Sequence, residues 1–243
     1  MKNIITRRSA LGLALAGFAA PSLITSSQAA TSGVLVELFT SQGCSDCPPA
    51  DKVAGELAQQ AGVHVVSLNV DYWDYLGWKD TLGKAQYSQR QTAYAKARGD
   101  GEVYTPQMVI NGAVHAVGSR KNLVEAAIAE ARAKANYVDL SISANADALH
   151  IKVGAGTGNG TVWLMGISPS VSVPIGRGEN AGTNVTYHNV VRHLVSAGTW
   201  NGNAAEFNVS RNSVVSGDCR KILAVLQQGN VGSVLGLSTI TIS

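Results

Sequence analysis

The first half of the chain alternates short apolar runs with segments of helical periodicity. Val34–Phe39 and Val63–Val70 are apolar runs bounded by turn residues, which predicts two buried strands. Apolar residues at helical spacing lie between them, at Ala54, Leu57, Ala58 and Ala61. Gly62 stands where a helix C-cap is expected. Two buried strands joined by a helix predict a parallel βαβ unit.

Two further helices and a hairpin follow along the chain. One helix is expected from about Leu82 to Arg98, and another after Ser119, whose side chain can cap it. Between these helices two apolar runs flank Asn111-Gly112, a dipeptide typical of a tight hairpin turn. The predicted order as far as residue 136 is therefore β-α-β-α-β-β-α.

Beyond residue 136 the hydrophobic period changes to two. Short alternating segments are separated by Gly, Asn and Ser clusters, and strands are expected at 138–142, 149–153, 162–167, 184–195, 205–210, 220–227 and 234–242. This spacing is typical of an antiparallel sandwich. The predicted fold class is an α/β domain at 31–136 followed by an all-β sandwich-like domain at 137–243.

The first 29 residues have the pattern of a secretory signal peptide. Lys2, Arg7 and Arg8 precede an apolar run from Ala10 to Ala20, and Ser27-Gln28-Ala29 fits a small-x-small cleavage site. The apolar run is too short to span a membrane. We therefore expect an exported protein, periplasmic or secreted, with no stable membrane insertion after cleavage. The adjacent arginines leave both the Sec and the twin-arginine routes open.

Charge and composition exclude some classes of partner and activity. The chain has 19 basic and 16 acidic residues, and three of the basic ones lie in the predicted signal peptide. The exported part is therefore close to neutral, which gives no electrostatic basis for binding nucleic acid or an anionic membrane. The sequence also lacks phosphate loops, serine-nucleophile elbows and zinc-protease helices, so a hydrolase has no support.

Cys44-Ser45-Asp46-Cys47 follows the first predicted strand, at the expected start of a helix. Unpaired N–H groups and the positive end of the helix dipole stabilise a thiolate at Cys44, the form that attacks a disulfide. Cys47, one turn on, can then resolve the mixed disulfide. The carboxylate of Asp46 disfavours a second negative charge, so we expect a more reducing couple than that of a strongly oxidising enzyme.

Three interpretations of the cysteine pair stay open. Thiol–disulfide exchange needs no cofactor, because the electrons come from a partner dithiol. A periplasmic metal-binding or delivery protein would hold Cu(I) or Zn through the same thiolates, although one Cys pair is only half of a tetrahedral zinc site. A structural disulfide is the third interpretation, with recognition left to the second domain. Cys219, the remaining cysteine, is expected to be a buried small hydrophobic residue.

An aromatic and acidic stretch, Asp71–Trp78, follows the second predicted strand. The carboxyl ends of parallel strands meet at one edge of a sheet, so this stretch and the cysteine pair are expected to be neighbours. One hypothesis is a substrate wall beside Cys44, with Trp73 or Trp78 as the apolar contact. The other is packing of these aromatic rings between the two domains.

His188, Val190 and Arg192 share one face of a predicted strand in the second half of the chain. These side chains either bind a ligand or dock against the cysteine pair, with His188 also a candidate metal ligand. The alternative is an ordinary solvated strand face.

Several segments resemble one known family: Val36–Cys44, Cys47–Asp51, Asp71–Asp74, Arg177–Asn180 and Tyr187–Arg192. Over nearly all of its length after residue 29, the chain is similar to the secreted thioredoxin-like family catalogued as domain of unknown function 1223. The order of elements, with Thr105-Pro106 before the third strand, resembles the thioredoxin superfamily. This resemblance implies a thioredoxin-like first domain, and a cis Thr105–Pro106 bond that faces the cysteine pair and offers the Thr105 backbone to a substrate.

These observations favour an exported thiol–disulfide oxidoreductase that acts on protein or small-molecule disulfides. Cys44 would be the nucleophile and Cys47 the resolving thiol. The expected substrate-side residues are Thr105, Pro106, Trp73 and Trp78. The expected partner is a redox protein or a disulfide substrate, and the function requires neither a metal nor an organic cofactor.

Overall fold

The computed structural model describes residues 33–134 and 137–242. The predicted signal peptide at 1–29 lies outside the described residues, and the predicted domain boundary falls at 135–136, which are not described either. Both stay predictions. Among the described residues, none of the helices is both long and apolar enough to cross a membrane.

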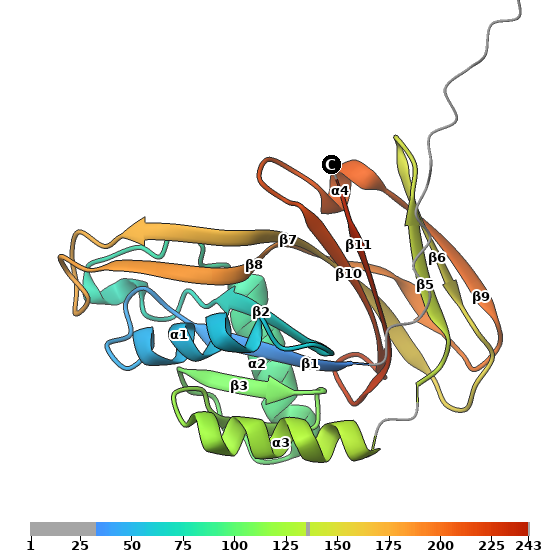
Figure 1. Cartoon of the computed structure of the whole chain (residues 1–243), viewed down its shortest axis with the longest axis horizontal. Coiled ribbons are helices and arrows are strands. Elements are labelled where there is room, and N and C mark those ends of the chain that lie inside the picture. Colours follow the sequence, from blue (N-terminus) through green and yellow to red (C-terminus); the bar gives the residue numbers. More distant parts are fainter. Residues whose placement is uncertain (1–32, 135–136, 243) are drawn as a thin grey trace, which may run out of the picture.

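The first half of the chain follows the predicted succession of elements (Figure 1). They are β1 (Val34–Thr40), α1 (Pro48–Leu57), β2 (Val63–Asn69), the short 3-10 helix η1 (Asp74–Leu76), α2 (Ala85–Arg98), β3 (Gln107–Ile110), β4 (Val114–Val117) and α3 (Lys121–Lys134). β1 and β2 pair in parallel, so the predicted βαβ unit is confirmed. α1 ends at Leu57, before the expected cap at Gly62, and α2 begins three residues later than expected.

Alternate side chains of β1 face opposite sides of the sheet, as the strand pleat requires. On one side Val36 and Leu38 pack with α1 and α3. On the other side Leu35 and Phe39 pack with residues of α2. Helices therefore cover both faces of this part of the sheet, which explains why β1 is buried along its whole length.

The second half contributes strands close to the predicted positions. They are β5 (Leu140–Ala144), β6 (Ala148–Val153), β7 (Gly160–Pro174), β8 (Asn184–Trp200), β9 (Ala205–Ser210), β10 (Lys221–Gln228) and β11 (Val234–Thr241), with the short helix α4 (Arg211–Val214) before β10. β7 and β8 are both longer than expected. They form a hairpin whose tip extends well beyond the other strands of this half (Figure 1).

The predicted fold class, an α/β thioredoxin-like domain followed by an all-β sandwich-like domain, is wrong. One mixed sheet of eight strands contains strands from both halves of the chain, in the order β11-β10-β7-β8-β2-β1-β3-β4. Only β5, β6 and β9 form a separate, three-stranded sheet. The described part of the chain is therefore mostly β, with its two halves joined in one large sheet.

The join between the halves has a physical cause at the edge of β2. An open strand edge exposes unpaired N–H and C=O groups, which favours pairing with another strand. β8 pairs in parallel with β2 at Ser67 and Val190, and the Ser67 hydroxyl donates to the carbonyl oxygen of His188 at 2.9 Å. β7 runs on to Pro174, beyond its predicted end at 167, and supports β8 along this edge.

A buried ion pair also connects the two halves. Arg90 of α2 donates from Nε to Oε1 of Glu37 on β1 at 2.7 Å. The same guanidinium donates from Nη2 to Oε1 of Gln227 on β10 at 2.6 Å. The Tyr94 hydroxyl donates to the Glu37 carboxylate as well. Because a buried charge is costly without its partner, this network ties α2, β1 and β10 together.

Candidate dithiol site

Cys44 and Cys47 form a disulfide between the end of β1 and the start of α1, with a Cα–Cα distance of 5.4 Å. Cys47 is the N-cap residue of α1. Both cysteines are buried: Cys44 is 3% exposed and Cys47 is fully covered. The residues between them, Ser45 and Asp46, are exposed. The disulfide therefore lies just beneath a small exposed loop.

The helix start differs from the sequence-based expectation in one respect. Pro48 and Pro49 occupy the first two helical positions, and proline has no N–H. The next backbone donor, Ala50 N, is bonded to the carbonyl oxygen of Cys47 at 2.8 Å. The helix dipole still points at the cysteines, but the first helical turn offers Cys44 no free N–H.

Trp73 lies between the cysteine loop and Thr105. A Cβ atom on Gly43 would lie only 3.0 Å from Cβ of Trp73, so the two residues are in close contact. The indole Nε1 of Trp73 donates to Oγ1 of Thr105 at 2.7 Å. The Thr105–Pro106 peptide bond is cis, as the resemblance predicts. Of the two predicted tryptophans, Trp73 is thus the one that touches both the cysteine loop and the cis-proline segment.

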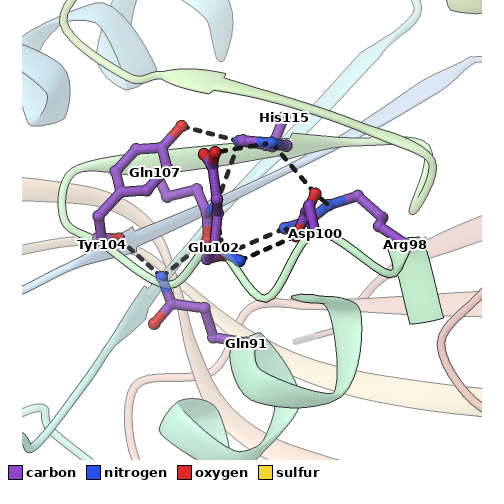
Figure 2. A network of polar contacts seen from close by, with 7 residues as sticks. All are labelled: Gln91, Arg98, Asp100, Glu102, Tyr104, Gln107 and His115. Atoms are coloured by element: carbon purple, nitrogen blue, oxygen red, sulfur yellow. Dashed lines mark hydrogen bonds and ion pairs between the residues drawn. The ribbon is translucent and has the colours of Figure 1, made fainter. Parts of the chain in front are cut away.

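A polar network holds the loop that leads to the cis-proline (Figure 2). The Tyr104 hydroxyl and Nδ1 of His115 lie 2.8 Å apart, and Nε2 of Gln91 donates to the carbonyl oxygen of Tyr104 at 2.7 Å. Arg98 and Asp100 are joined at 2.7 Å at the start of the loop. Tyr104, the residue before Thr105, is therefore held by contacts to α2 and to β4.

Trp78 has a different position from Trp73. Its Nε1 donates to Oε1 of Gln42 at 2.8 Å, and its ring packs with a cluster that includes Val173, Ile175 and Tyr187 of the second half. This arrangement matches the packing alternative for Trp78. Whether either tryptophan contacts a substrate stays a prediction.

Gln42 is the centre of the contacts that hold the cysteine loop. Its backbone N–H donates to Oδ2 of Asp80 at 2.7 Å. Its carbonyl oxygen accepts from Nδ2 of Asn180 at 3.0 Å, and the same Asn180 amide donates to the carbonyl oxygen of Cys44 at 2.8 Å. Asn180 is buried in the β7–β8 connection. The far end of the long hairpin therefore holds the backbone immediately before and at Cys44.

A buried carboxyl group lies one helical turn from Cys47. Asp51 is 2% exposed, and its Oδ1 accepts from the Thr40 hydroxyl at 2.9 Å. Its other oxygen has no hydrogen-bond partner among the described residues. Burial raises the pKa of Asp51 to about 8, although the Thr40 hydrogen bond opposes this shift. Positions i and i+4 share a helix face, so Asp51 and Cys47 lie on the same side of α1.

A family model matches residues 35–227, a span that includes the cysteine pair, Trp73, the cis-proline and Asn180. The chain belongs to the family described as "Protein of unknown function (DUF1223)". The matched range includes strands of the large sheet from both halves of the chain, whereas β11 lies beyond it. The DUF1223 match therefore covers the whole candidate site.

Solved structures resemble this DUF1223 chain to different degrees. The crystal structure of the protein AGR_C_4864 from Agrobacterium tumefaciens is 30% identical, with a TM-score of 0.74 over 85% of this chain and 93% of that one. The protein HBP35 of Porphyromonas gingivalis is 13% identical, with a TM-score of 0.54 over 87% of this chain and 76% of that one, a likeness in fold alone. No curated protein matches the chain.

The remaining predicted residues of this DUF1223 chain have mainly structural surroundings. The ring of His188 packs on α1, where a Cβ on Gly55 would lie 2.6 Å from its Nε2. Among the described residues no group of three or more His, Cys, Asp or Glu side chains is placed to hold a metal ion. Cys219 is a buried free cysteine, as predicted.

Sequence reasoning assigned no role to Asp51 or Asn180. Both residues lie in segments that resemble the DUF1223 family, Cys47–Asp51 and Arg177–Asn180. This resemblance was the sequence feature that could have pointed to them. Their partners come from other elements of the fold, so their contacts with the cysteine loop emerge only in three dimensions.

Proposed function

We propose that this protein is an exported thiol–disulfide oxidoreductase, periplasmic or secreted, that acts on protein or small-molecule disulfides through Cys44 and Cys47. One observation carries this function. The cysteines are disulfide-bonded at the start of α1, and Trp73 joins their loop to the cis Thr105–Pro106 segment. A cysteine pair at a helix start, beside a segment that can receive a substrate chain, has the parts that thiol–disulfide exchange requires.

The exchange proceeds in two steps that move two electrons. The thiolate of Cys44 attacks one sulfur of the substrate disulfide, so that a mixed disulfide forms and the other substrate sulfur leaves as a thiolate. The thiolate of Cys47 then attacks Sγ of Cys44 and releases the second substrate thiol. The substrate is reduced and the Cys44–Cys47 disulfide forms. A partner dithiol returns the pair to its reduced state.

Asp51 is placed to move the proton of Cys47. Before the second step the Cys47 thiol must lose a proton inside a buried site. The carboxyl group of Asp51 lies on the same side of α1, and one of its oxygens has no hydrogen-bond partner in the part of the chain that the structure describes. Burial raises its pKa to about 8. The ionised form of Asp51, a minor fraction at neutral pH that grows as the pH approaches 8, takes up the proton, and the protonated form returns it in the reverse reaction.

The surroundings of Cys44 favour a reducing reaction and restrict the access of a substrate. Pro48 and Pro49 remove the free N–H groups that would stabilise a thiolate, and Asp46 disfavours one. Both effects favour a reducing couple. Cys44 is nearly covered, and Asn180 bonds to its carbonyl oxygen, so the β7–β8 connection must shift to admit a protein substrate.

The cis-proline beside the β1–α1–β2 unit supports a link between this site and the thioredoxin superfamily, as a likeness of the site and not of the whole fold. The metal-delivery alternative rests only on the two thiolates. The described residues offer no third His, Cys, Asp or Glu side chain to complete a ligand group there.

Trapping of the mixed disulfide tests the proposed function. In the Cys47→Ser, Cys219→Ser variant we expect Cys44 to form a mixed disulfide with oxidised glutathione or a disulfide-bonded peptide, released again by dithiothreitol. Mass spectrometry and peptide mapping identify the bond. The matched control is Cys44→Ser, Cys219→Ser, which keeps only the fully covered Cys47. No adduct on Cys44, or equal adducts on both variants, would contradict the function.

A further inference from the structure

A cavity of about 220 Å³ lies between the segment that begins α2 and the strand β8. Its lining includes Thr81, Gly83, Lys84, Arg192, His193 and Ser216. Three of these residues, Thr81, Gly83 and Lys84, belong to the first half of the chain, and the other three belong to the second half. The cavity is thus formed by the junction of the two halves. Neither cysteine of the Cys44–Cys47 pair lines it, although Thr81 is bonded to the side chain of Gln42 at 3.0 Å.

Carboxylates neutralise the positive groups of this cavity, Lys84 and Arg192, only in part. Among the described residues, no salt bridge joins Lys84 or His193 to an acidic side chain. Arg192 has one acidic neighbour, Asp218, at 3.7 Å between Nε and Oδ1. Both members of that pair are partly exposed, so their attraction is weak and screened by solvent. The cavity therefore has an excess of positive charge.

The ammonium of Lys84 and the guanidinium of Arg192 are close enough to repel one another. Burial lowers the pKa of Lys84, and the neighbouring guanidinium of Arg192 lowers it further. Burial likewise lowers the pKa of His193, with added repulsion from Lys84 and Arg192. The Lys84 ammonium also donates to the carbonyl oxygen of Arg192, which fixes it over β8. Like charges held together in this way are stabilised by a bound anion.

We propose that this cavity binds a small tetrahedral oxyanion, such as sulfate, phosphate or the equivalent group of a larger molecule. The Lys84 ammonium and the Arg192 guanidinium are charged donors that come from two different elements, the segment before α2 and β8, and together they suit an oxyanion with several acceptor oxygens. The hydroxyls of Thr81 and Ser216 line the same space. Oγ1 of Thr81 accepts from Nε2 of Gln42 at 3.0 Å, and Oγ of Ser216 lies 2.5 Å from Nε2 of His193, so a bound anion competes with these contacts for the two hydroxyls. The site does not depend on the proposed redox function, so either can fail without the other.

Titration calorimetry of the full chain with sodium sulfate at low ionic strength tests this site. We expect saturable binding that weakens about tenfold in Lys84→Met and in Arg192→Met. Lys152→Met is the matched control, because that ammonium is already paired with Glu206 at 3.0 Å, and it should bind as the wild type does. Circular dichroism confirms that each variant is folded.

Two further measurements sharpen the test. Phosphate should compete with sulfate and acetate should not, because acetate lacks the tetrahedral group. Sulfate binding should also strengthen from pH 7 to pH 5 as His193 gains a proton, and His193→Gln should remove this gain. The other titratable groups near the cavity are Lys84, Arg192, Asp218, Tyr87 and Cys219.

Three results would contradict the proposal that this cavity binds an oxyanion. They are the absence of saturable sulfate binding, equal affinity in the wild type and both methionine variants, and equal affinity for acetate and sulfate. Equal affinity across the variants would mean general counter-ion binding.

Discussion

The side-chain amide of Asn180 lies 2.8 Å from the carbonyl oxygen of Cys44, and this hydrogen bond joins residues 136 positions apart in the chain. The second half of the chain therefore takes part directly in the surroundings of the cysteine pair. We expect that the buried disulfide reacts at a rate that depends on how readily the β7–β8 connection moves away from Cys44.

Removal of this hydrogen bond should expose the disulfide. In Asn180→Ala we expect reduction of Cys44–Cys47 by dithiothreitol to become about threefold to tenfold faster, while loss of the two buried bonds lowers the free energy of unfolding by about 1–3 kcal/mol. Stopped-flow reduction and urea unfolding measure the two effects. Glu179→Ala, at the exposed neighbouring position, is the control and should change neither. An unchanged reduction rate in Asn180→Ala would show that the connection does not control access.

The raised pKa of Asp51 predicts how stability depends on pH. The carboxyl group is protonated in the folded state up to about pH 8 but ionises near pH 4 when unfolded, so folding takes up a proton between these values. Stability should therefore fall as the pH rises through this window, with a slope of up to about 1.4 kcal/mol per pH unit from this group. Asp51→Asn should remove that contribution to the slope, whereas Asp46→Asn should not. Equal slopes in wild type and Asp51→Asn would contradict the assignment.

The same residue predicts a change in the exchange reaction. With no proton acceptor at position 51, resolution of the mixed disulfide by Cys47 should slow about tenfold or more at neutral pH in Asp51→Asn. The rate should also lose the rise with pH that the wild type shows as it approaches about pH 8. Quenched-flow analysis of mixed-disulfide decay measures this step apart from the initial attack by Cys44. A uniform loss in both steps would point to a structural role.

Substitution of Trp73 should affect the rate of disulfide exchange, whereas substitution of Trp78 should affect stability. Trp73→Phe removes the hydrogen bond to Thr105 and should lower the second-order rate with a disulfide-bonded peptide by about threefold to tenfold, with a small effect on the melting temperature. Trp78→Phe removes the bond to Gln42 and should mainly lower the melting temperature. If Trp73→Phe changes neither property, Trp73 has neither a substrate nor a structural role.

The shared sheet predicts that both halves unfold together. Glu37→Gln leaves the buried guanidinium of Arg90 without its charged partner, which should cost about 3–5 kcal/mol of stability. The fluorescence of Trp73 and that of Trp200, which report on opposite halves, should follow one transition in single-tryptophan variants. Two separate transitions would indicate two independent folding units.

The local elements of this fold were predictable because their patterns are local. Periods of two and of 3.6 identified most strands and helices, and Asn111-Gly112 marked the hairpin, where both residues have positive φ. Pairing between distant strands was not predictable. The β2–β8 contact joins Ser67 to His188, 121 residues away, and no periodicity specifies such a partner.

The candidate site was predictable only in part for the same reason. The Cys44–Cys47 spacing and the Thr105-Pro106 dipeptide are recognisable from the sequence alone. Asp51 reads as an ordinary acidic residue in the first turn of a helix, and only the burial of α1 against the sheet makes its proton affinity unusual. In the sequence Asn180 resembles an ordinary turn residue, and its contact with Cys44 is seen only in the structure.

The reduction potential of the Cys44–Cys47 pair tests the proposed redox function most directly. It is measured in the Cys219→Ser variant by equilibration with a glutathione or dithiothreitol series. A potential between about −200 and −270 mV, the reducing part of the range of exchange-active dithiols, is the predicted result. A potential below about −300 mV would mark a structural disulfide and contradict the proposed function.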